Sequence, residues 1–228
     1  MIRWRAPGPY VVAFTSREGG VSTGPFASLN LGSREDAPER IAENRRRACA
    51  ALGLDPDRLA VNRQRHTAVA RRARPDGPRL VGDALWTDEA GVPMLALAAD
   101  CVPIAVAVSD GRPALAVVHA GWRGLALGVV ATAVAALGDA PTAAIVGPAI
   151  GPCCYQVGAE VAGRFDPDLT RGGMLDLWTA AERALRRAGV AAVERVDLCT
   201  RCHPDRFFSH RASGYRRGAQ GVIGAVAG

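Results

Sequence analysis

The sequence contains no lysine, so each of its 28 basic residues is an arginine. This bias is typical of a GC-rich coding preference and carries little functional information. Aromatic residues make up only 5% of the chain, and few of them lie within the arginine-rich stretches ENRRRACA and RQRHTAVARRARP. The net charge of +6 suits either a nucleic acid or an anionic small molecule. The scarcity of aromatic residues among the arginines argues against the nucleic acid.

Long hydrophobic runs are also absent. The longest uncharged helical candidate, GLALGVVATAVAALG, has 15 residues, fewer than the roughly 20 that a membrane span needs. The N-terminal stretch MIRWRAPGPYVVAFTSREGG has no apolar core followed by a small-residue cleavage site, as a secretory signal would. We therefore expect no membrane association and a cytoplasmic location, in which the six cysteines would be reduced.

No internal repeat, low-complexity tract or long linker divides the 228 residues, so we expect one domain over residues 1–228. Strands are predicted at 10–15, 58–67, 94–108, 114–119, 143–147, 193–198 and 218–226. Helices are predicted at 38–52, 122–137 and 175–189, with a short one from residue 159. This mixed order predicts an α/β or α+β fold: a single domain with a mixed β-sheet that contains a central antiparallel hairpin and is flanked by helices.

The first predicted helix carries three consecutive arginines. Its apolar stripe consists of Ile41, Ala48 and Leu52. We therefore expect Arg45, Arg46 and Arg47 on the opposite, solvated face rather than in a binding surface.

The predicted central hairpin brings a cysteine and a histidine onto neighbouring strands. In an antiparallel pair, the numbers of opposed residues add to a constant, which a turn at Asp110 or Gly111 sets at about 220 to 222. Cys101 and His119 fit this sum, so they share a face if the register is even, although Pro103 could introduce a bulge. The pair suits three roles: packing residues, ligands of one Zn²⁺, or a nucleophilic thiol with its base.

The segment after His119, AGWRGLALG, leads from a strand into a helix through Gly121 and Gly124. Free amide groups at a helix start, with Arg123 beside them, form a ready site for a phosphate or a developing oxyanion. His66 ends the strand predicted at 58–67. It is a natural third ligand if a zinc ion with one open position lies here, although spacing alone does not place it.

Six motifs together resemble one family. They read FTSREGGVSTGPFASLNLG, NRQRH, GDALWTDEAGVPMLALAADCVPIAV, VVHAGWRG, GPAIGPCCYQVG and CTRCHPDRFFSHR. Their order and spacing, from Val11 to Ala225, are similar to those of the bacterial laccase-domain (YfiH-like) family, whose members are also called polyphenol oxidases, peptidoglycan editing factors and purine nucleoside phosphorylases. The resemblance implies that His66, Cys101 and His119 are zinc ligands and catalytic residues.

The resemblance also implies an activity. We expect a zinc-dependent purine nucleoside phosphorylase that converts adenosine, inosine or methylthioadenosine and phosphate to the free base and ribose 1-phosphate, with adenosine deamination at the same zinc. Two alternatives stay open: a Cys–His hydrolase that removes a wrong amino acid from a peptidoglycan precursor, and a polyphenol oxidase that uses adventitious copper at the zinc site. We expect a monomer that binds small molecules and no nucleic acid.

Composition limits the oxidase alternative. A multicopper oxidase holds its copper cluster with many histidines arranged in His-x-His pairs. The chain has four histidines and no such pair. We therefore expect at most a single, adventitious copper ion.

Further motif residues are candidates for the substrate pocket. Those expected to contact substrate or phosphate are Arg123, Gly121, Gly124, Arg17, Asn30, Gln64, Cys154 and Tyr155. Asp100 is expected to orient a metal ligand without binding the metal itself. Two stretches depart from the family pattern. QRHT has Arg65 and Thr67 where the family has an apolar residue and a glycine, and YRRGAQ stands where the family often has Thr-Gly-Arg-Gln, so no arginine is assigned there.

The remaining cysteines pose a separate question. CTRCH matches the attachment pattern of c-type haem, which we reject because no export signal is predicted and the family's C-terminal motif accounts for the segment. Cys199 and Cys202 would make half of a structural zinc site. Because Cys153 and Cys154 are adjacent and no second Cys-x-x-Cys exists, we expect no such site.

Overall fold

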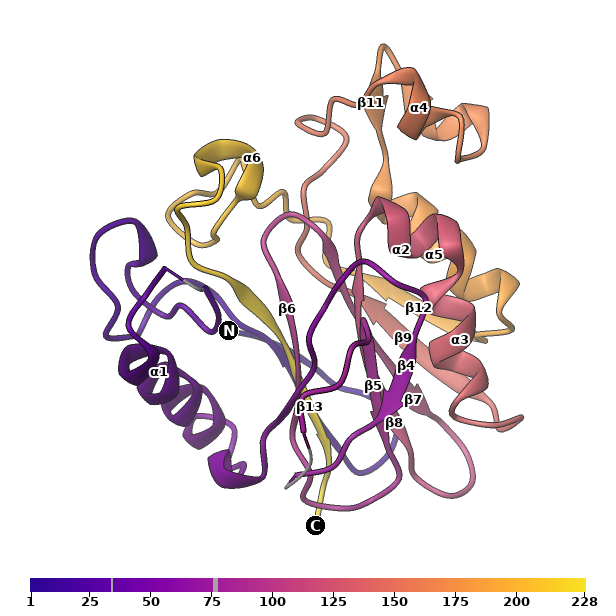
Figure 1. The fold of residues 1–228 in the computed structure, drawn as a ribbon. Helices are drawn as coiled ribbons and strands as arrows, with labels where there is room; N and C mark the ends of the chain where they lie inside the picture. Colours follow the sequence, from indigo (N-terminus) through magenta and orange to yellow (C-terminus); the bar gives the residue numbers. More distant parts are fainter. Residues whose placement is uncertain (34, 76–77) are drawn as a thin grey trace.

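Two mixed β-sheets packed face to face form the centre of the molecule (Figure 1). The computed structural model describes residues 1–33, 35–75 and 78–228. The first sheet has the strand order β1 (Ile2–Trp4), β2 (Tyr10–Phe14), β13 (Gln220–Val226), β6 (Met94–Ala98) and β3 (Ala60–Val61). The second has the order β12 (Ala192–Arg195), β9 (Thr142–Val146), β7 (Val102–Val108), β8 (Leu115–Ala120), β5 (Ala84–Thr87) and β4 (Ala70–Arg72).

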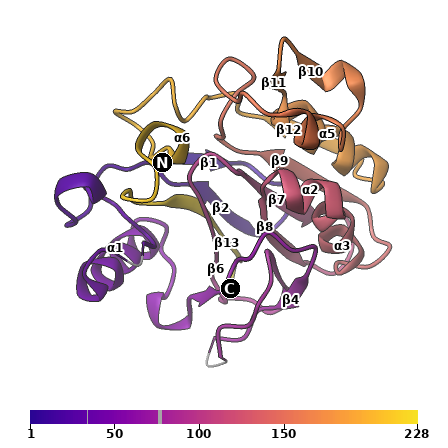
Figure 2. The same cartoon turned by 45° about the horizontal axis from the view of Figure 1, so that its top comes forward.

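Helices cover the outer face of each sheet, which makes four layers. The helix α1 (Pro38–Ala50) lies on the five-stranded sheet, and α2 (Trp122–Leu127), α3 (Val129–Ala135) and α5 (Leu177–Arg187) lie on the six-stranded sheet (Figures 1 and 2). Short elements complete the chain: α4 (Ala159–Ala162), α6 (His210–Ser213), β10 (Thr170–Arg171), β11 (Met174–Leu175), and 3₁₀ turns at Gly24–Phe26, Pro56–Arg58 and Pro167–Leu169. None of the described helices has the length and apolar character that crossing a membrane requires.

The strands of the second sheet are buried on both faces. Ile104 and Val106 of β7 pack against the helices, whereas Ala105 and Ala107 pack against the first sheet. This arrangement explains why VPIAVAV is a continuous apolar run rather than an alternating one. Ile104 is fully buried, so its truncation to alanine would cost about 2–5 kcal/mol of stability.

The predicted fold class is confirmed, but two predicted strands are wrong in their extent. The strand expected at 94–108 divides into β6 and β7, which belong to different sheets. Asp100, between them, has a φ of 89°, a conformation that ends an extended run. The strand expected at 58–67 is only β3, so the chain from Asn62 to Thr67 forms a loop.

Two helix predictions also need correction. The helix expected at 122–137 is broken by Gly128, which has a left-handed φ of 87° and separates α2 from α3. Arg45 does not share the solvated face of Arg46 and Arg47. Its Nε donates to the carbonyl oxygen of Leu31 at 2.8 Å, and burial lowers its pKa to about 10.

Candidate functional site

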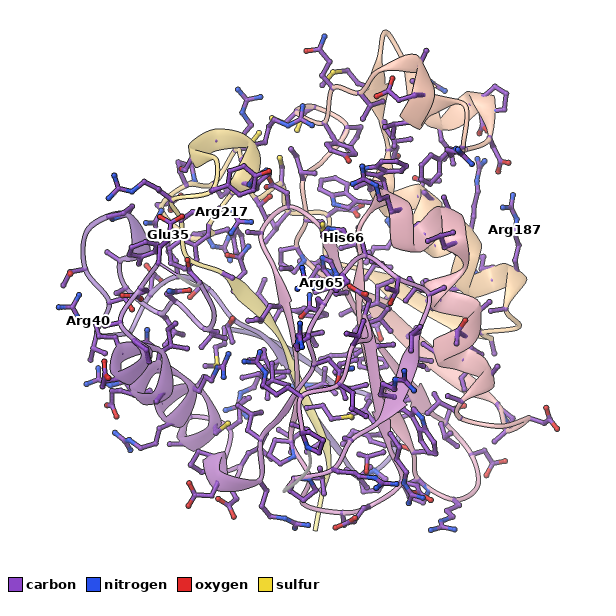
Figure 3. The ribbon with its side chains drawn as sticks, viewed as in Figure 1. Glu35, Arg40, Arg65, His66, Arg187 and Arg217 are labelled. Atoms are coloured by element: carbon purple, nitrogen blue, oxygen red, sulfur yellow. The ribbon has the colours of Figure 1, made fainter. Side chains whose placement is uncertain are left out.

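His66, Cys101 and His119 meet at one end of the space between the two sheets. Their ligating atoms all lie within 4.8 Å of one another. The Nε2 atom of His66 is 3.8 Å from the Sγ atom of Cys101, and the two imidazole rings meet edge to face with centroids 4.9 Å apart. Figure 3 shows His66 at the centre of the molecule, between its two halves.

The register of the central hairpin brings the cysteine and His119 together. Pro103 is paired with His119, and the pairing between β7 and β8 is regular from Val102 to Ala107, so Pro103 causes no bulge in it. Cys101 comes directly before β7 and is therefore diagonal to His119 on the same face. The loop that follows β3 brings in His66 from the other sheet.

Asp83, just ahead of β5, holds two of the three residues in place. Its Oδ1 atom lies 2.8 Å from Nδ1 of His119 and accepts the backbone amide of His66 at 3.0 Å. The other carboxylate oxygen accepts the amides of Arg65 at 3.1 Å and Thr67 at 2.7 Å, and the Thr67 hydroxyl at 2.7 Å. With Nδ1 occupied in this way, Nε2 of His119 is left to face the cluster.

Sequence reasoning missed Asp83. The residue belongs to the motif GDALWT, and a carboxylate directly before a buried strand was the available signal. Burial acts to raise its pKa, but the hydrogen bonds from His119, Thr67 and Arg65 hold that pKa well below its usual range. The carboxylate is therefore ionised at neutral pH.

Backbone strain concentrates at the same place. Three described residues other than glycine have a positive φ, and two of them are His66, at 59°, and Asp100, at 89°. Such conformations cost on the order of 1–3 kcal/mol each and persist where surrounding contacts enforce them. At His66 those contacts are the hydrogen bonds to Asp83.

Cys101 and His119 each favour the charged form of the other, the thiolate and the imidazolium. Burial would raise the pKa of the Cys101 thiol, but His119 and His66 lower it to about 6. Burial would lower the pKa of His119, but Cys101 and Asp83 raise it to about 9. In the metal-free protein the pair is therefore a thiolate beside an imidazolium at neutral pH.

Gly121 leaves the space that the cluster occupies. A Cβ atom at this position would lie 2.8 Å from Cδ2 of His66 and 2.9 Å from Sγ of Cys101. Two imidazoles and a thiolate suit Zn²⁺ and other thiophilic ions, and three protein ligands leave one position for a substrate group. His66 is exposed and His119 is buried, so a substrate would approach from the His66 side. The residues present therefore fit a metal ion.

Several side chains surround the cluster. The Asp100 carboxylate accepts the Thr200 hydroxyl and the backbone amide of Arg211, each at 2.6 Å. Burial and the nearby charge of Cys101 raise the pKa of Tyr155 to about 12. Arg123 is exposed and lies over the ring of Trp122 at 4.3 Å.

Three other candidates make contacts within the protein. Arg17 donates to the carbonyl oxygens of Ala27 and Pro204, at 2.9 and 2.6 Å. The Gln64 side chain makes hydrogen bonds of 2.7 and 2.8 Å with the backbone of Leu97. Asn30 is fully buried and its side chain donates to Asp36 at 2.8 Å. Each of these three side chains is thus hydrogen-bonded within the protein.

The Cys154 thiol points to a different neighbour. Its Sγ lies 3.5 Å from Sγ of Cys202, which belongs to the segment after β12.

Gly124 has more space for a side chain than Gly121 has. A Cβ atom on Gly124 would meet only Val129 Cγ1 closely, at 3.3 Å.

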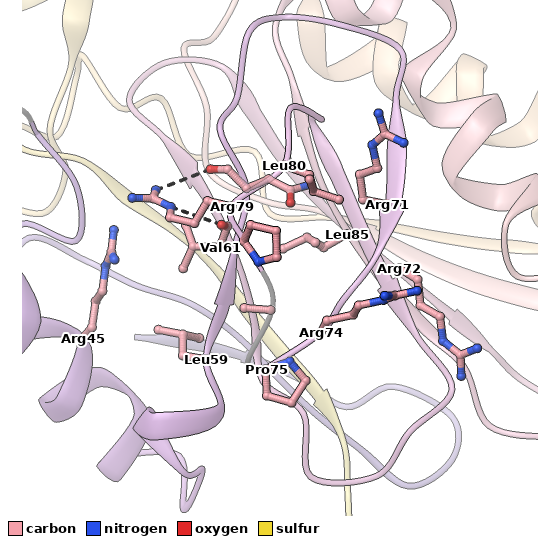
Figure 4. Close-up of a pocket in the computed structure, with 13 residues that line it drawn as sticks. Arg45, Leu59, Val61, Arg71, Arg72, Arg74, Pro75, Arg79, Leu80 and Leu85 are labelled. Atoms are coloured by element: carbon pink, nitrogen blue, oxygen red, sulfur yellow. Dashed lines mark hydrogen bonds between the residues drawn. The ribbon is translucent and has the colours of Figure 1, made fainter.

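The protein also has arginine-rich cavities outside the cluster. One of about 210 Å³ is lined by 13 residues, among which five are arginines: Arg45, Arg71, Arg72, Arg74 and Arg79 (Figure 4). A second, of about 480 Å³, shares Arg45 and Arg79 with it and extends to Gln64 and Arg65. Neither cavity is lined by His66, Cys101 or His119. The second reaches the residue before His66 and so adjoins the site.

A sequence model of the family described as multi-copper polyphenol oxidoreductase laccase matches residues 11–226. The chain belongs to this laccase-like family. The membership inferred from the six motifs is thereby confirmed.

The relatives of this laccase-like protein carry a different kind of name. The chain is 38% identical to a purine nucleoside phosphorylase of Xylella fastidiosa, over 91% of this chain and 89% of that protein. It is 31% identical to purine nucleoside phosphorylase YfiH of Escherichia coli, over 92% and 91%. The crystal structure of YlmD from Geobacillus stearothermophilus has a TM-score of 0.89 at 32% identity, and the match covers 99% of this chain and 94% of that one.

Proposed function

We propose that this protein is a zinc-dependent purine nucleoside phosphorylase whose substrates are adenosine, inosine or methylthioadenosine and inorganic phosphate. In this reaction a phosphate oxygen forms a bond to C1′ of the ribose as the glycosidic bond to the purine breaks. The base leaves with the bonding electrons and takes up a proton, which balances the proton that phosphate gives up. The products are the free base and ribose 1-phosphate.

The observation that carries the proposal is the three-residue cluster, backed by Asp83, in a chain whose relatives are named purine nucleoside phosphorylases. His66, Cys101 and His119 would hold the metal. A bound Zn²⁺ would supply Lewis acidity toward a substrate oxygen or a water molecule. Asp83 would fix the ring orientation of His119 during turnover.

The surrounding residues would bind and orient the two substrates. The first amides of α2 have no partner within the helix, and Arg123 lies beside them, which suits a phosphate. Because α2 has only six residues, Arg123 would supply most of the attraction. The Tyr155 hydroxyl, whose pKa is raised to about 12, would stay protonated and donate a hydrogen bond to the nucleoside.

The direct test is an assay of each nucleoside with and without phosphate, in which the free base and ribose 1-phosphate are measured. Cys101→Ala should lose both turnover and zinc. Cys49→Ala removes a buried thiol of α1 that lies outside the cluster, so this variant should keep its turnover and its zinc. Unchanged phosphorolysis in Cys101→Ala would refute the mechanism.

Deamination of adenosine is the second reaction that we propose for this site. The oxygen of a water molecule would bond to C6 as the bond from C6 to the amino nitrogen breaks. One proton of that water would leave with the nitrogen as ammonia, and the other would stay on the purine ring of inosine. This reaction needs no phosphate. Release of ammonia and inosine in phosphate-free buffer would support deamination at this site. If neither product is released there, the hypothesis is wrong.

A second candidate function is a Cys–His amide hydrolase that edits a peptidoglycan precursor, and the ionised Cys101–His119 pair favours it. The Cys101 thiolate would attack the amide carbonyl, the His119 imidazolium would protonate the leaving amine, and water would then hydrolyse the thioester. An electrophilic analogue of the amide should label Cys101 in metal-free protein under this hypothesis. Activity that requires zinc and disappears with a chelator would contradict it.

A copper-dependent polyphenol oxidase is the remaining alternative, and the description of the family favours it. Cu²⁺ would use the same three ligands, since it binds nitrogen and sulfur ligands more tightly than Zn²⁺ does. Copper-loaded protein should then oxidise a phenol, with dissolved O₂ as the electron acceptor, at a rate that zinc-loaded protein lacks. We expect any such rate to fall with Cys101→Ala.

A further inference from the structure

Four cysteines from two distant segments form a second cluster. Cys153 and Cys154 lie in the loop that follows β9, and Cys199 and Cys202 lie in the turn that follows β12. All four Sγ atoms lie within 4.8 Å of one another. The sequence-based expectation that these cysteines lack partners for a site is therefore wrong, because the fold supplies the adjacent pair where a second Cys-x-x-Cys would stand.

The spacing of the sulfur atoms fits a tetrahedral ion. With zinc–sulfur bonds of about 2.3 Å, the sulfur atoms of a tetrahedral site lie about 3.8 Å apart. The Sγ atom of Cys202 lies 3.6 Å from that of Cys153 and 3.5 Å from that of Cys154. A disulfide requires about 2.05 Å, and all four cysteines are free thiols in this structure.

The backbone around the cluster supports a bound thiolate. The amide of Gly151 donates to Sγ of Cys199 at 3.3 Å, and such bonds orient a ligand and stabilise its negative charge. A Cβ atom on Gly151 would lie 2.6 Å from the ring of Trp178 and 3.3 Å from Sγ of Cys153. Glycine at this position therefore leaves room for the Trp178 ring and for the Cys153 thiol beside the cluster.

The two cysteine segments are also joined through their backbones. The amide of Ala149 donates to the carbonyl oxygen of Leu198 at 3.2 Å, and the amide of Thr200 donates to that of Ala149 at 3.1 Å. Cys199 is buried, whereas Cys153 and Cys202 are exposed. An ion would thus have an inner anchor and an open path of entry, as a metal site requires.

We propose that Cys153, Cys154, Cys199 and Cys202 hold a structural Zn²⁺ through four thiolates, separate from the cluster of His66, Cys101 and His119. Four thiolate ligands complete the coordination shell and leave no position for a substrate, which is typical of structural zinc. The all-sulfur ligand set selects a thiophilic ion over Mg²⁺ or Ca²⁺.

This second ion would stabilise one wall of the proposed substrate site. Cys154 precedes Tyr155, whose pKa responds to the charge of Cys101. Cys199 precedes Thr200, whose hydroxyl donates to Asp100 at 2.6 Å. Crosslinking these two segments through zinc would fix Tyr155 and Thr200 relative to the first cluster without any contact between the ion and the substrate.

The test compares the metal content of four full-length proteins purified with a non-chelating reductant. The wild type should hold one zinc ion more than Cys199→Ser/Cys202→Ser, and the ion remaining in that variant should be lost when Cys101→Ala is added. Cys49→Ala, which removes a thiol outside both clusters, should match the wild type. The double variant should also melt roughly 5 to 10 °C lower, as expected when a bound metal no longer stabilises a chain of this size.

Co²⁺ substitution gives a readout that is independent of activity. The near-ultraviolet thiolate-to-metal charge-transfer band grows with the number of bound thiolates. Loss of Cys101 should therefore remove about one fifth of the band, and loss of the four-cysteine site about four fifths. This pattern would hold whether or not the protein is a phosphorylase, so the two proposals fail separately.

If the double variant does not fold, the exposed Cys153→Ser and the wild type itself keep the proposal testable. In wild-type protein, a thiol reagent should label five more cysteines after a chelator is added than before: Cys101 and the four cysteines of this cluster. Zinc content that is equal in the wild type and Cys153→Ser, together with labelling of Cys153, Cys154, Cys199 and Cys202 that the chelator does not change, would overturn the proposal. So would an intact mass lower by about 2 Da per pair, which marks disulfides instead.

Discussion

The Nδ1 atom of His119 lies 2.8 Å from the Oδ1 atom of Asp83, and the amide of His119 donates to the carbonyl oxygen of the same aspartate at 2.7 Å. Asp83→Asn would place an amide group among hydrogen-bond donors that now face a carboxylate. Loss of a carboxylate that hydrogen-bonds a metal-ligating histidine typically reduces metal affinity 10–100-fold. We expect a loss of about that size, measured by zinc competition with a chromogenic chelator.

Asp36→Asn is the matched control for that variant. Asp36 is also buried and accepts hydrogen bonds from Ser22 and Asn30, at 2.6 and 2.8 Å, but no described contact joins it to the metal cluster. The Asp36→Asn variant should have a lower free energy of unfolding and an unchanged zinc affinity. Equal zinc affinities in the two variants would contradict the assigned role of Asp83.

The contrast between Asp83 and Cys101 shows what the sequence could predict. The central hairpin and the helix at 175–189 follow from local periodicity, and the even register of β7 and β8 follows from their short turn. The meeting of His66 with Cys101 does not, because it depends on a loop from the other sheet and on a positive φ at His66. The place of Asp83 directly before a buried strand marks it as a candidate, but its partners are backbone amides of a distant loop, which the sequence does not identify.

The same limit explains the second cysteine cluster. Cys153 and Cys199 are 46 positions apart in the chain, and the parallel pairing of β9 with β12, together with the bridge between Ala149 and Cys199, brings their segments together. A spacing rule based on two Cys-x-x-Cys pairs cannot recognise a site that uses an adjacent pair. The division of 94–108 into two strands was hidden for a related reason, since both halves are apolar and only Asp100 interrupts them.

Gly121→Ala should disrupt the cluster through space alone. The new Cβ atom would lie 2.8 Å from Cδ2 of His66 and 2.9 Å from Sγ of Cys101, closer than nonbonded carbon atoms pack. One of the two ligands must shift, so we expect lower zinc content and a loss of phosphorolysis. Gly163→Ala, where φ is −66° and the nearest atom is the carbonyl oxygen of Ala159 at 3.2 Å, should leave both unchanged.

Cys101 should be unusually reactive in the metal-free protein. Because its pKa is lowered to about 6, the thiol is mostly thiolate at pH 7, and its alkylation by iodoacetamide should decline only as the pH falls through about 6. An ordinary cysteine, with a pKa of about 8.5, would already be slow at pH 7. Peptide mass spectrometry follows the labelling.

The same sample contains the control for this pH profile. Burial raises the pKa of Cys154 to about 11, so its alkylation should stay slow through neutral pH. His119→Ala removes the main charge that favours the Cys101 thiolate and should move the midpoint of the profile upward. A midpoint near 8.5 in the unmodified protein would show that the thiolate–imidazolium pair does not form.

Asn30→Ala should affect stability and not substrate binding. The Asn30 side chain is fully buried, donates to Asp36 at 2.8 Å and accepts the amides of Gly32 and Ala219 at 3.0 and 2.9 Å. Its removal leaves buried groups without partners, which costs about 1–3 kcal/mol. Urea unfolding should show that loss, whereas a rise in KM with unchanged stability would instead assign Asn30 to the substrate pocket.

Of the two arginines of YRRGAQ, Arg217 is half-buried and Arg216 is exposed, and we expect Arg217 to be the one that acts on a substrate. Burial lowers its pKa, and Asp100 and Cys101 lie close enough to oppose that shift. Its Nε atom is buried without a hydrogen-bond partner among the described residues. Arg217→Gln should therefore raise KM for phosphate or nucleoside about 10–100-fold, as expected for a lost charged hydrogen bond. Arg216→Gln is the control, because Arg216 is exposed and lies 3.8 Å from Glu35; equal KM values in the two variants would contradict the assignment.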